Sequence, residues 1–145
     1  MGRKVRMVHK DWSHPKTEKG NCKPLHEGYK SDAAEFLEMA NKDGLQEAVD
    51  YMGCPDKEDY MPDWDEAEKT HLIMYEDTTE GTPISPAFKT PEELAKWLAD
   101  NGASSFGSST ATYEQWLPVC KGGWAPSMVL SSKGLQSGVE AISDL

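Results

Sequence analysis

Three cysteines and four histidines are the side chains in this sequence with the most familiar chemistry. Cys22 and His26 are separated by three residues, whereas Cys54 and Cys120 lie far from them along the chain. A structural zinc site needs four ligands in a closed tetrahedron, usually with a closely spaced cysteine pair that this sequence lacks. We therefore expect reduced thiols, no bound metal and no cofactor.

The histidines could also support acid–base catalysis. A free imidazole titrates near neutrality and needs only one oriented partner, so one of the many carboxylates could form an acid–base pair with His9, His14 or His71. The sequence contains no nucleophile elbow, Walker loop or dinucleotide-binding fingerprint. Whether the protein is an enzyme stays open, and a non-enzymatic protein is favoured. A small nucleotide-processing enzyme is the third of three functional hypotheses.

Two loops rich in Ser and Thr precede predicted helices and could bind an anion. Free N–H groups and the positive end of a helix dipole attract phosphate, and a nearby aromatic ring could stack on a base. The same residue types more often serve as helix caps and turns. The second hypothesis is a protein that sequesters a nucleotide-like signalling molecule, with these ligand-binding candidates: Thr79, Thr82, Ser85, Ser105, Ser109, Tyr113, Trp116 and Trp124.

Residues 55–69 combine many carboxylates with two aromatic side chains and a methionine. An apolar centre with a charged rim is typical of a protein interface, and an acidic rim suits a basic partner. A charge run is often only a solvated face, and the aromatic residues could simply fasten the loop to its own core. The leading hypothesis is non-enzymatic binding of a basic protein surface through Asp56, Glu58, Asp59, Tyr60, Asp63, Trp64, Asp65 and Glu66.

The charge of the chain is unevenly distributed. The formal net charge is -10, with +5 in residues 1–30, -13 in residues 31–80 and -2 in the remainder. The acidic middle disfavours direct binding to nucleic acid. No apolar run is long enough to span a membrane, and the basic N-terminus is not followed by a signal-peptide segment, so we expect a cytoplasmic protein.

The 145 residues fit one domain, with a basic N-terminal strand or arm (1–30) and an acidic middle (31–80). The predicted class is α+β, with a small and mostly antiparallel sheet covered by several short helices. Its strands are expected at an edge-type segment 4–9 and at 71–77 and 128–130. Predicted helices begin after caps at Ser31, Thr90, Thr112 and Ser137 and at Leu45, and Pro118 should limit the helix capped by Thr112.

Apolar residues at helical or strand spacing predict the core. The residues expected to be buried are Phe36, Leu37, Leu72, Ile73, Met74, Leu94, Trp97, Leu98, Trp116 and Leu117.

Several short runs resemble small proteins of tailed bacteriophages and prophages that have no characterised activity. The runs are YMPxW (60–64), EGTPISP (80–86), TPEELA (90–95), YExW (113–116) and GWAPS (123–127), so the resemblance covers roughly residues 60–130. It implies no catalytic residue, cofactor or fold. It does imply a setting in the host cell, where such accessory proteins inhibit host defence or nucleic-acid machinery by covering a protein surface or by sequestering a nucleotide signal.

Overall fold

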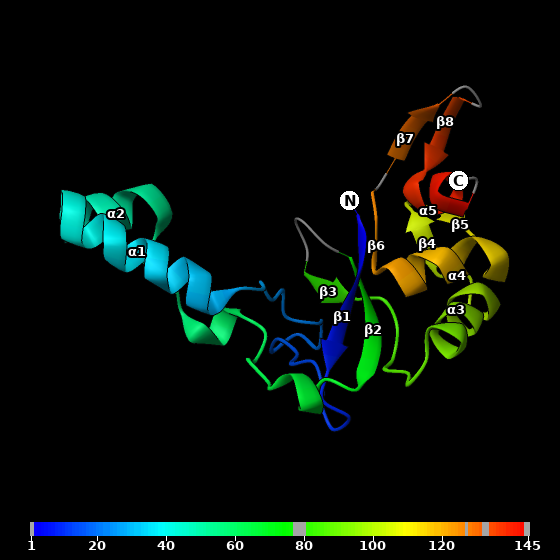
Figure 1. The fold of residues 1–145 in the computed structure, drawn as a ribbon, viewed down its shortest axis with the longest axis horizontal. Coiled ribbons are helices and arrows are strands. Elements are labelled where there is room, and N and C mark those ends of the chain that lie inside the picture. Colours follow the sequence, from blue (N-terminus) through cyan, green and yellow to red (C-terminus); the bar gives the residue numbers. More distant parts are fainter. Residues whose placement is uncertain (1, 77–80, 127, 132–133, 144–145) are drawn as a thin grey trace. The chain divides into compact units, whose positions relative to one another are not determined.

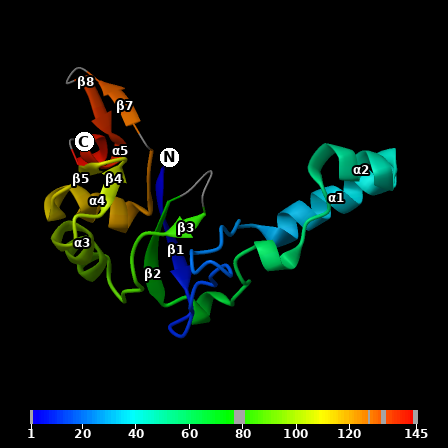
Figure 2. The same ribbon diagram turned by 180° about the vertical axis from the view of Figure 1, so that it is seen from behind.

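The computed structural model describes residues 2–76, 81–126, 128–131 and 134–143 (Figures 1 and 2). The chain divides into two compact units. The sheet unit comprises Met1–Lys23 and Trp64–Leu145, and the helical unit comprises Pro24–Asp63. The single-domain organisation of the chain stays a prediction.

A four-stranded antiparallel sheet forms the centre of the sheet unit. Its order is β3 (Thr82–Pro83), β2 (His71–Glu76), β1 (Arg3–Val8) and β6 (Trp124–Ala125). β1 and β2 pair along their whole lengths, from Arg3 opposite Glu76 to Val8 opposite His71. On its other side β1 pairs with β6, but only at Arg3 and Lys4. The prediction of an edge strand near residues 4–9 is therefore wrong at the start of β1, where strands flank it on both sides. Arg3 and Arg6 of β1 are buried. The Arg3 guanidinium is stabilised there by donating to the Ser104 carbonyl oxygen at 2.8 Å.

The main core lies between this sheet and three helices of the sheet unit. These are α3 (Pro91–Asp100), α4 (Tyr113–Gly122) and α5 (Gly138–Ser143), which lie beside one another on one side of the sheet in both ribbon views (Figures 1 and 2). Alternation along β2 directs Leu72 and Met74 towards the helices. The fully or nearly fully buried residues that they meet are Leu94, Ala95, Leu98, Trp116, Val119, Cys120, Ala125 and Val139.

The predicted helix caps in the sheet unit are confirmed. Thr90 accepts a hydrogen bond from the Glu93 amide at 3.2 Å, Thr112 accepts one from the Gln115 amide at 3.2 Å, and Ser137 accepts one from the Glu140 amide at 3.2 Å. Such caps satisfy N–H groups that have no partner within the helix. The expected stop at Pro118 is wrong, because α4 continues to Gly122 with the proline inside it.

Two hairpins complete the sheet unit. One pairs β4 (Ser104–Phe106) with β5 (Ser109–Thr110), and the other pairs β7 (Met128–Ser131) with β8 (Gly134–Ser137). The strand predicted at 128–130 is present, but it pairs in this hairpin and not in the central sheet. The sequence analysis missed β3 and β6 because two residues are too few to show strand periodicity.

The helical unit contains α1 (Tyr29–Asp43), α2 (Leu45–Met52) and the short 3-10 helix η1 (Lys57–Asp59). A second 3-10 helix, η2 (Glu66–Glu68), belongs to the sheet unit. α1 begins two residues before the predicted cap at Ser31, with Gly28 in the left-handed conformation (φ 82°). Gly44 (φ 94°) separates α1 from α2, and this backbone conformation is one that glycine adopts without strain.

Most of the core prediction is confirmed. Phe36, Leu72, Ile73, Met74, Leu94, Leu98 and Trp116 are buried. Trp97 and Leu117 are partly buried against the main core. Leu37 is wrong, because its side chain is 61% exposed on α1. The apolar stripe of α1 is narrower than its sequence indicates.

The architecture is α+β, with small antiparallel sheets and short helices, as the sequence predicts. Within the described residues, no helix is both long and apolar enough to cross a membrane.

Candidate functional site

The helical unit contains most of the net charge of the protein. Residues 24–63 contain eleven Asp and Glu against three Lys, a net charge of -8 out of -10. Ten of the eleven acidic residues are exposed, and the exception, Asp32, is half-buried. Because exposed like charges reinforce one another at long range, the unit presents a negative field to any approaching molecule.

The predicted partner-binding segment crosses the boundary between the two units. Asp56, Glu58, Asp59, Tyr60 and Asp63 belong to the helical unit, whereas Trp64, Asp65 and Glu66 belong to the sheet unit. All six carboxylates in this set are exposed. Asp63 forms an ion pair with Lys30, and Glu66 pairs with Lys69 at 2.6 Å.

The aromatic residues of the segment pack against their own units. The Tyr60 hydroxyl donates to the Asp32 carboxylate at 2.6 Å, and its ring makes an edge contact with Tyr29 at 5.3 Å. The hydrogen bond to Asp32 is the largest of the effects that raise the pKa of Tyr60 to about 12. Trp64 makes an edge contact with Trp12 at 5.2 Å. These rings anchor the segment, so its predicted apolar centre is largely occupied.

A backbone clasp closes the base of the helical unit. The His26 amide donates to the Asp59 carbonyl at 2.9 Å, and the Met61 amide donates to the His26 carbonyl at 2.8 Å. With the Tyr60 ring tilted against His26 at 5.6 Å, the two ends of the unit are joined next to η1. This clasp fixes the position, on the helical unit, of the carboxylates that follow Pro55.

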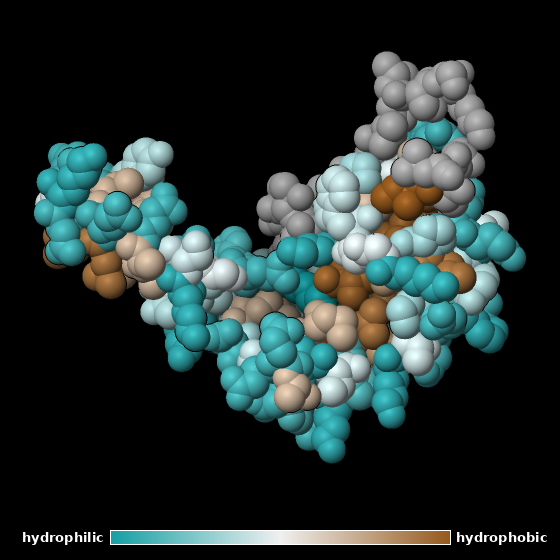
Figure 3. Space-filling model, in the orientation of Figure 1, coloured by the Kyte–Doolittle hydropathy of each residue, from teal (hydrophilic) through white to brown (hydrophobic). Residues whose placement is uncertain are grey.

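The sequence analysis missed an exposed apolar surface on the same unit. Leu45 is 66% exposed, Val49 41% and Tyr51 76% on α2, in addition to Leu37 on α1. In the space-filling view, apolar residues reach the surface of this unit among hydrophilic ones (Figure 3). The sequence does indicate an apolar helical face here, because Leu45, Ala48, Val49 and Met52 recur at helical spacing. Only Ala48 of that face is buried.

The structure distributes the proposed nucleotide-binding residues over different environments. Ser105 and Trp116 are fully buried, and Ser85 accepts a hydrogen bond from the Met74 amide at 2.9 Å. Thr82 lies in β3 of the central sheet, whereas Ser109 lies in the separate β4–β5 hairpin. Trp124 is 54% exposed. Thr79 lies outside the described residues.

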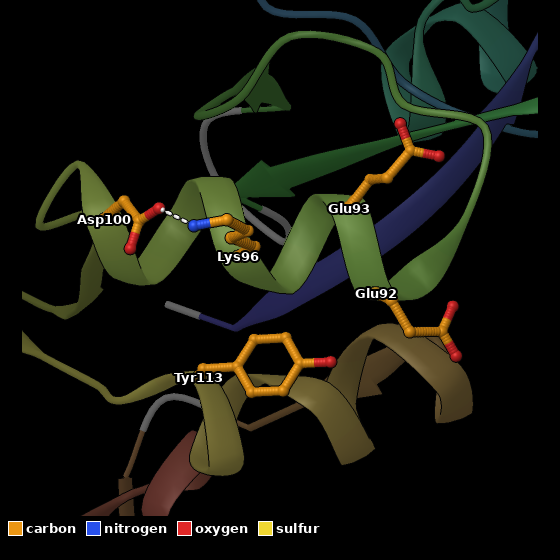
Figure 4. A pocket seen from close by; sticks show the side chains of 5 residues that line it. All are labelled: Glu92, Glu93, Lys96, Asp100 and Tyr113. Atoms are coloured by element: carbon orange, nitrogen blue, oxygen red, sulfur yellow. Dashed lines mark hydrogen bonds and ion pairs between the residues drawn. The ribbon is translucent and has the colours of Figure 1, made fainter.

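Tyr113 lines an open groove of about 410 Å³ between α3 and α4 (Figure 4). The other lining residues, from α3, are Glu92, Glu93, Lys96 and Asp100. Lys96 pairs with Asp100 at 2.7 Å, an interaction that raises the pKa of Lys96. Glu92 lies 3.7 Å from the Lys121 ammonium, and Glu93 accepts from the Thr90 hydroxyl at 3.0 Å. The charged groups of the groove are therefore engaged with neighbours of the same chain.

His14 belongs to a hydrogen-bonded cluster on the sheet face opposite the main core. Its Nε2 contacts the Lys23 carbonyl oxygen, which can only accept, so Nε2 carries the proton. Nδ1 of the neutral ring then accepts from the Tyr75 hydroxyl at 2.9 Å, and the Trp12 indole donates to that hydroxyl at 3.4 Å. The Arg6 guanidinium lies 4.3 Å from the centre of the Tyr75 ring. These contacts attach residues 12–23 to the sheet and use both nitrogens of His14.

Burial is the main cause that lowers the pKa of His14, and the positive charge of Arg6 lowers it further.

His71 contacts the Thr70 hydroxyl at 2.9 Å at the start of β2. Among the described side chains, no group of three or more His, Cys, Asp and Glu residues is placed to hold a metal ion.

Comparison of the chain with protein-family models, with curated proteins and with solved structures gave no match.

Proposed function

We propose that the protein is a non-enzymatic binding protein whose acidic helical unit engages a partner protein with a basic surface. One observation carries the proposal: residues 24–63 have a net charge of -8, and every charged side chain among them except Asp32 is exposed. Complementary charge accelerates the encounter with a basic partner and suppresses wrong partners.

The resemblance to small phage and prophage proteins suggests where the partner comes from. Proteins that handle nucleic acids carry basic surfaces because they must neutralise phosphates. In the proposed role, the protein acts in the host cytoplasm, covers such a surface on a host defence or nucleic-acid-processing protein, and inhibits it. The protein itself touches neither nucleic acid nor membrane.

The first test identifies the partner. The tagged full chain is incubated with bacterial host lysate, and native mass spectrometry of the recovered protein reports bound proteins and small ligands separately. We expect a basic protein. Recovery of a nucleotide-like ligand, with binding lost in Thr82→Ala, would instead establish the second hypothesis of a sequestering protein.

The second test measures association kinetics with that partner. Asp56→Asn with Glu58→Gln removes two carboxylates from the helical unit, and the new amide oxygen can still accept the hydrogen bond that Asp56 receives from the Glu58 backbone N–H at 3.0 Å. Glu92→Gln with Glu114→Gln removes two exposed carboxylates from the sheet unit. We expect the first pair to slow association severalfold and flatten its dependence on salt, and the second pair to change little. Equal effects would refute an assignment to the helical unit.

A further inference from the structure

The apolar face of α2 is only partly buried within the protein. Leu45, Ala48, Val49 and Met52 follow one another at helical spacing, so they share one face of α2. Ala48 is completely buried, Met52 is half-buried, and Val49 and Leu45 are 41% and 66% exposed. Leu37, on α1, adds a third large apolar side chain at the surface of the same unit.

Exposed carboxylates accompany these apolar side chains on the same two helices. Glu38 and Asp43 are exposed on α1, and Glu47 and Asp50 are exposed on α2. Asp50 accepts a hydrogen bond from the Gln46 side chain at 2.9 Å, one helical turn away. Apolar contacts with a charged rim form the usual arrangement of a protein interface.

We propose that Leu37, Leu45 and Val49 form the apolar contact of the binding surface, and that its occupant is a basic amphipathic helix of another protein. The proposal rests on the binding function argued above and specifies its surface and partner. An apolar stripe with a period of one helical turn suits an amphipathic helix, whose leucine-type anchors recur at the same spacing. Lys and Arg on both sides of the partner's stripe then meet the carboxylates.

Charge excludes two other occupants. A second copy of this chain would bring two surfaces of net charge -8 together, and like charges at an interface oppose association. Cell membranes present anionic lipids on their cytoplasmic side and repel the same surface. A cationic partner is the one that gains both apolar burial and favourable electrostatics.

The test uses three synthetic peptides of equal positive charge with the full-length protein. One is a Lys/Leu peptide with helical amphipathicity, the second has the same composition in scrambled order, and the third is oligolysine. Fluorescence anisotropy gives each Kd, and circular dichroism reports helix formation in the peptide. We expect the amphipathic peptide to bind about tenfold more tightly than either of the others and to become helical on binding.

Leu45→Gln with Val49→Gln tests the named residues. Both side chains are exposed, and glutamine favours helix about as well as leucine and better than valine, so α2 should keep its structure. We expect this variant to lose the tenfold preference for the amphipathic peptide while its affinity for oligolysine stays unchanged. Met7→Gln is the matched control, because Met7 is 40% exposed and lies on the sheet unit.

The outcomes separate this inference from the proposed function. Equal binding of all three peptides, unchanged by Leu45→Gln with Val49→Gln, overturns the apolar contact but leaves the acidic binding function intact. No binding of any cationic peptide at low salt overturns both. Sedimentation of the free protein as a dimer that the double variant disrupts would show that a second copy is the occupant, against the proposal.

Discussion

Burial is the main reason that the fold of this protein favours the neutral form of His14, and it lowers the pKa of that side chain. The neutral ring donates from Nε2 to the Lys23 carbonyl and accepts at Nδ1 from Tyr75. A proton on Nδ1 would face the Tyr75 hydroxyl, which already accepts a hydrogen bond from the Trp12 indole, and the Arg6 cation lies close to the Tyr75 ring. Protonated His14 would therefore lose a hydrogen bond inside a partly buried cluster.

Acid should therefore destabilise the fold through His14. The pKa of His14 is lowered from its usual 6.5, so below that pH the unfolded chain binds a proton that the folded chain does not. We expect the free energy of unfolding, measured with urea at several pH values, to fall as the pH decreases from 7 through the range just below 6.5. His14→Gln should be less stable at pH 7 and show a shallower slope over this range. An identical slope in both proteins would contradict the assignment.

At the scale of single elements, α4 illustrates how packing overrides local preference. Pro118 is its sixth residue, where the ring removes a backbone N–H donor and crowds the preceding turn. Two features compensate for this cost. The Thr112–Gln115 capping box fixes the start of the helix, and Trp116, Val119 and Cys120 bury its face on either side of the proline.

Pro118→Ala should stabilise the protein by about 1–2 kcal/mol. A proline inside a helix costs about 3 kcal/mol, and part of the gain is lost because alanine leaves the unfolded chain more flexible. The side chain is exposed, so its removal leaves no cavity. Pro91→Ala is the control, since Pro91 begins α3, where proline suits the helix. Thermal unfolding should show a higher Tm for Pro118→Ala and no increase for Pro91→Ala.

At the scale of the whole molecule, the two units differ in how much apolar surface they bury. The fully or nearly fully buried apolar side chains of the helical unit are Leu25, Phe36 and Ala48, whereas the main core of the sheet unit contains ten buried residues among those described. The 40 residues of the helical unit also concentrate like charges that repel one another. A segment of this size seldom forms a stable core unaided.

We expect the helical unit to open before the sheet unit. In native-state hydrogen exchange, amides of α1 and α2 should exchange at least about tenfold faster than the paired amides of β1 and β2. Higher salt should slow exchange in α1 and α2 by screening the repulsion between their carboxylates. Equal protection in all four elements would show that the chain unfolds as one cooperative domain, as the sequence predicts.

The sequence by itself determined where the helices of the sheet unit begin. Thr90, Thr112 and Ser137 cap their helices through hydrogen bonds that span three residues, so the pattern is complete within a few positions. The α+β class and most of the core follow from periodicity in the same way. The concentration of acidic residues also needs no structure to be seen.

Tertiary structure alone decided which surfaces of the protein are available. Tyr60 is engaged by Asp32, twenty-eight positions earlier, and Trp64 by Trp12, so the aromatic residues expected at an interface are anchors. Leu37, expected in the core, is exposed with Leu45 and Val49. Hydrophobicity marks a residue as able to be buried, but burial requires a partner surface. The described chain covers these three side chains only in part.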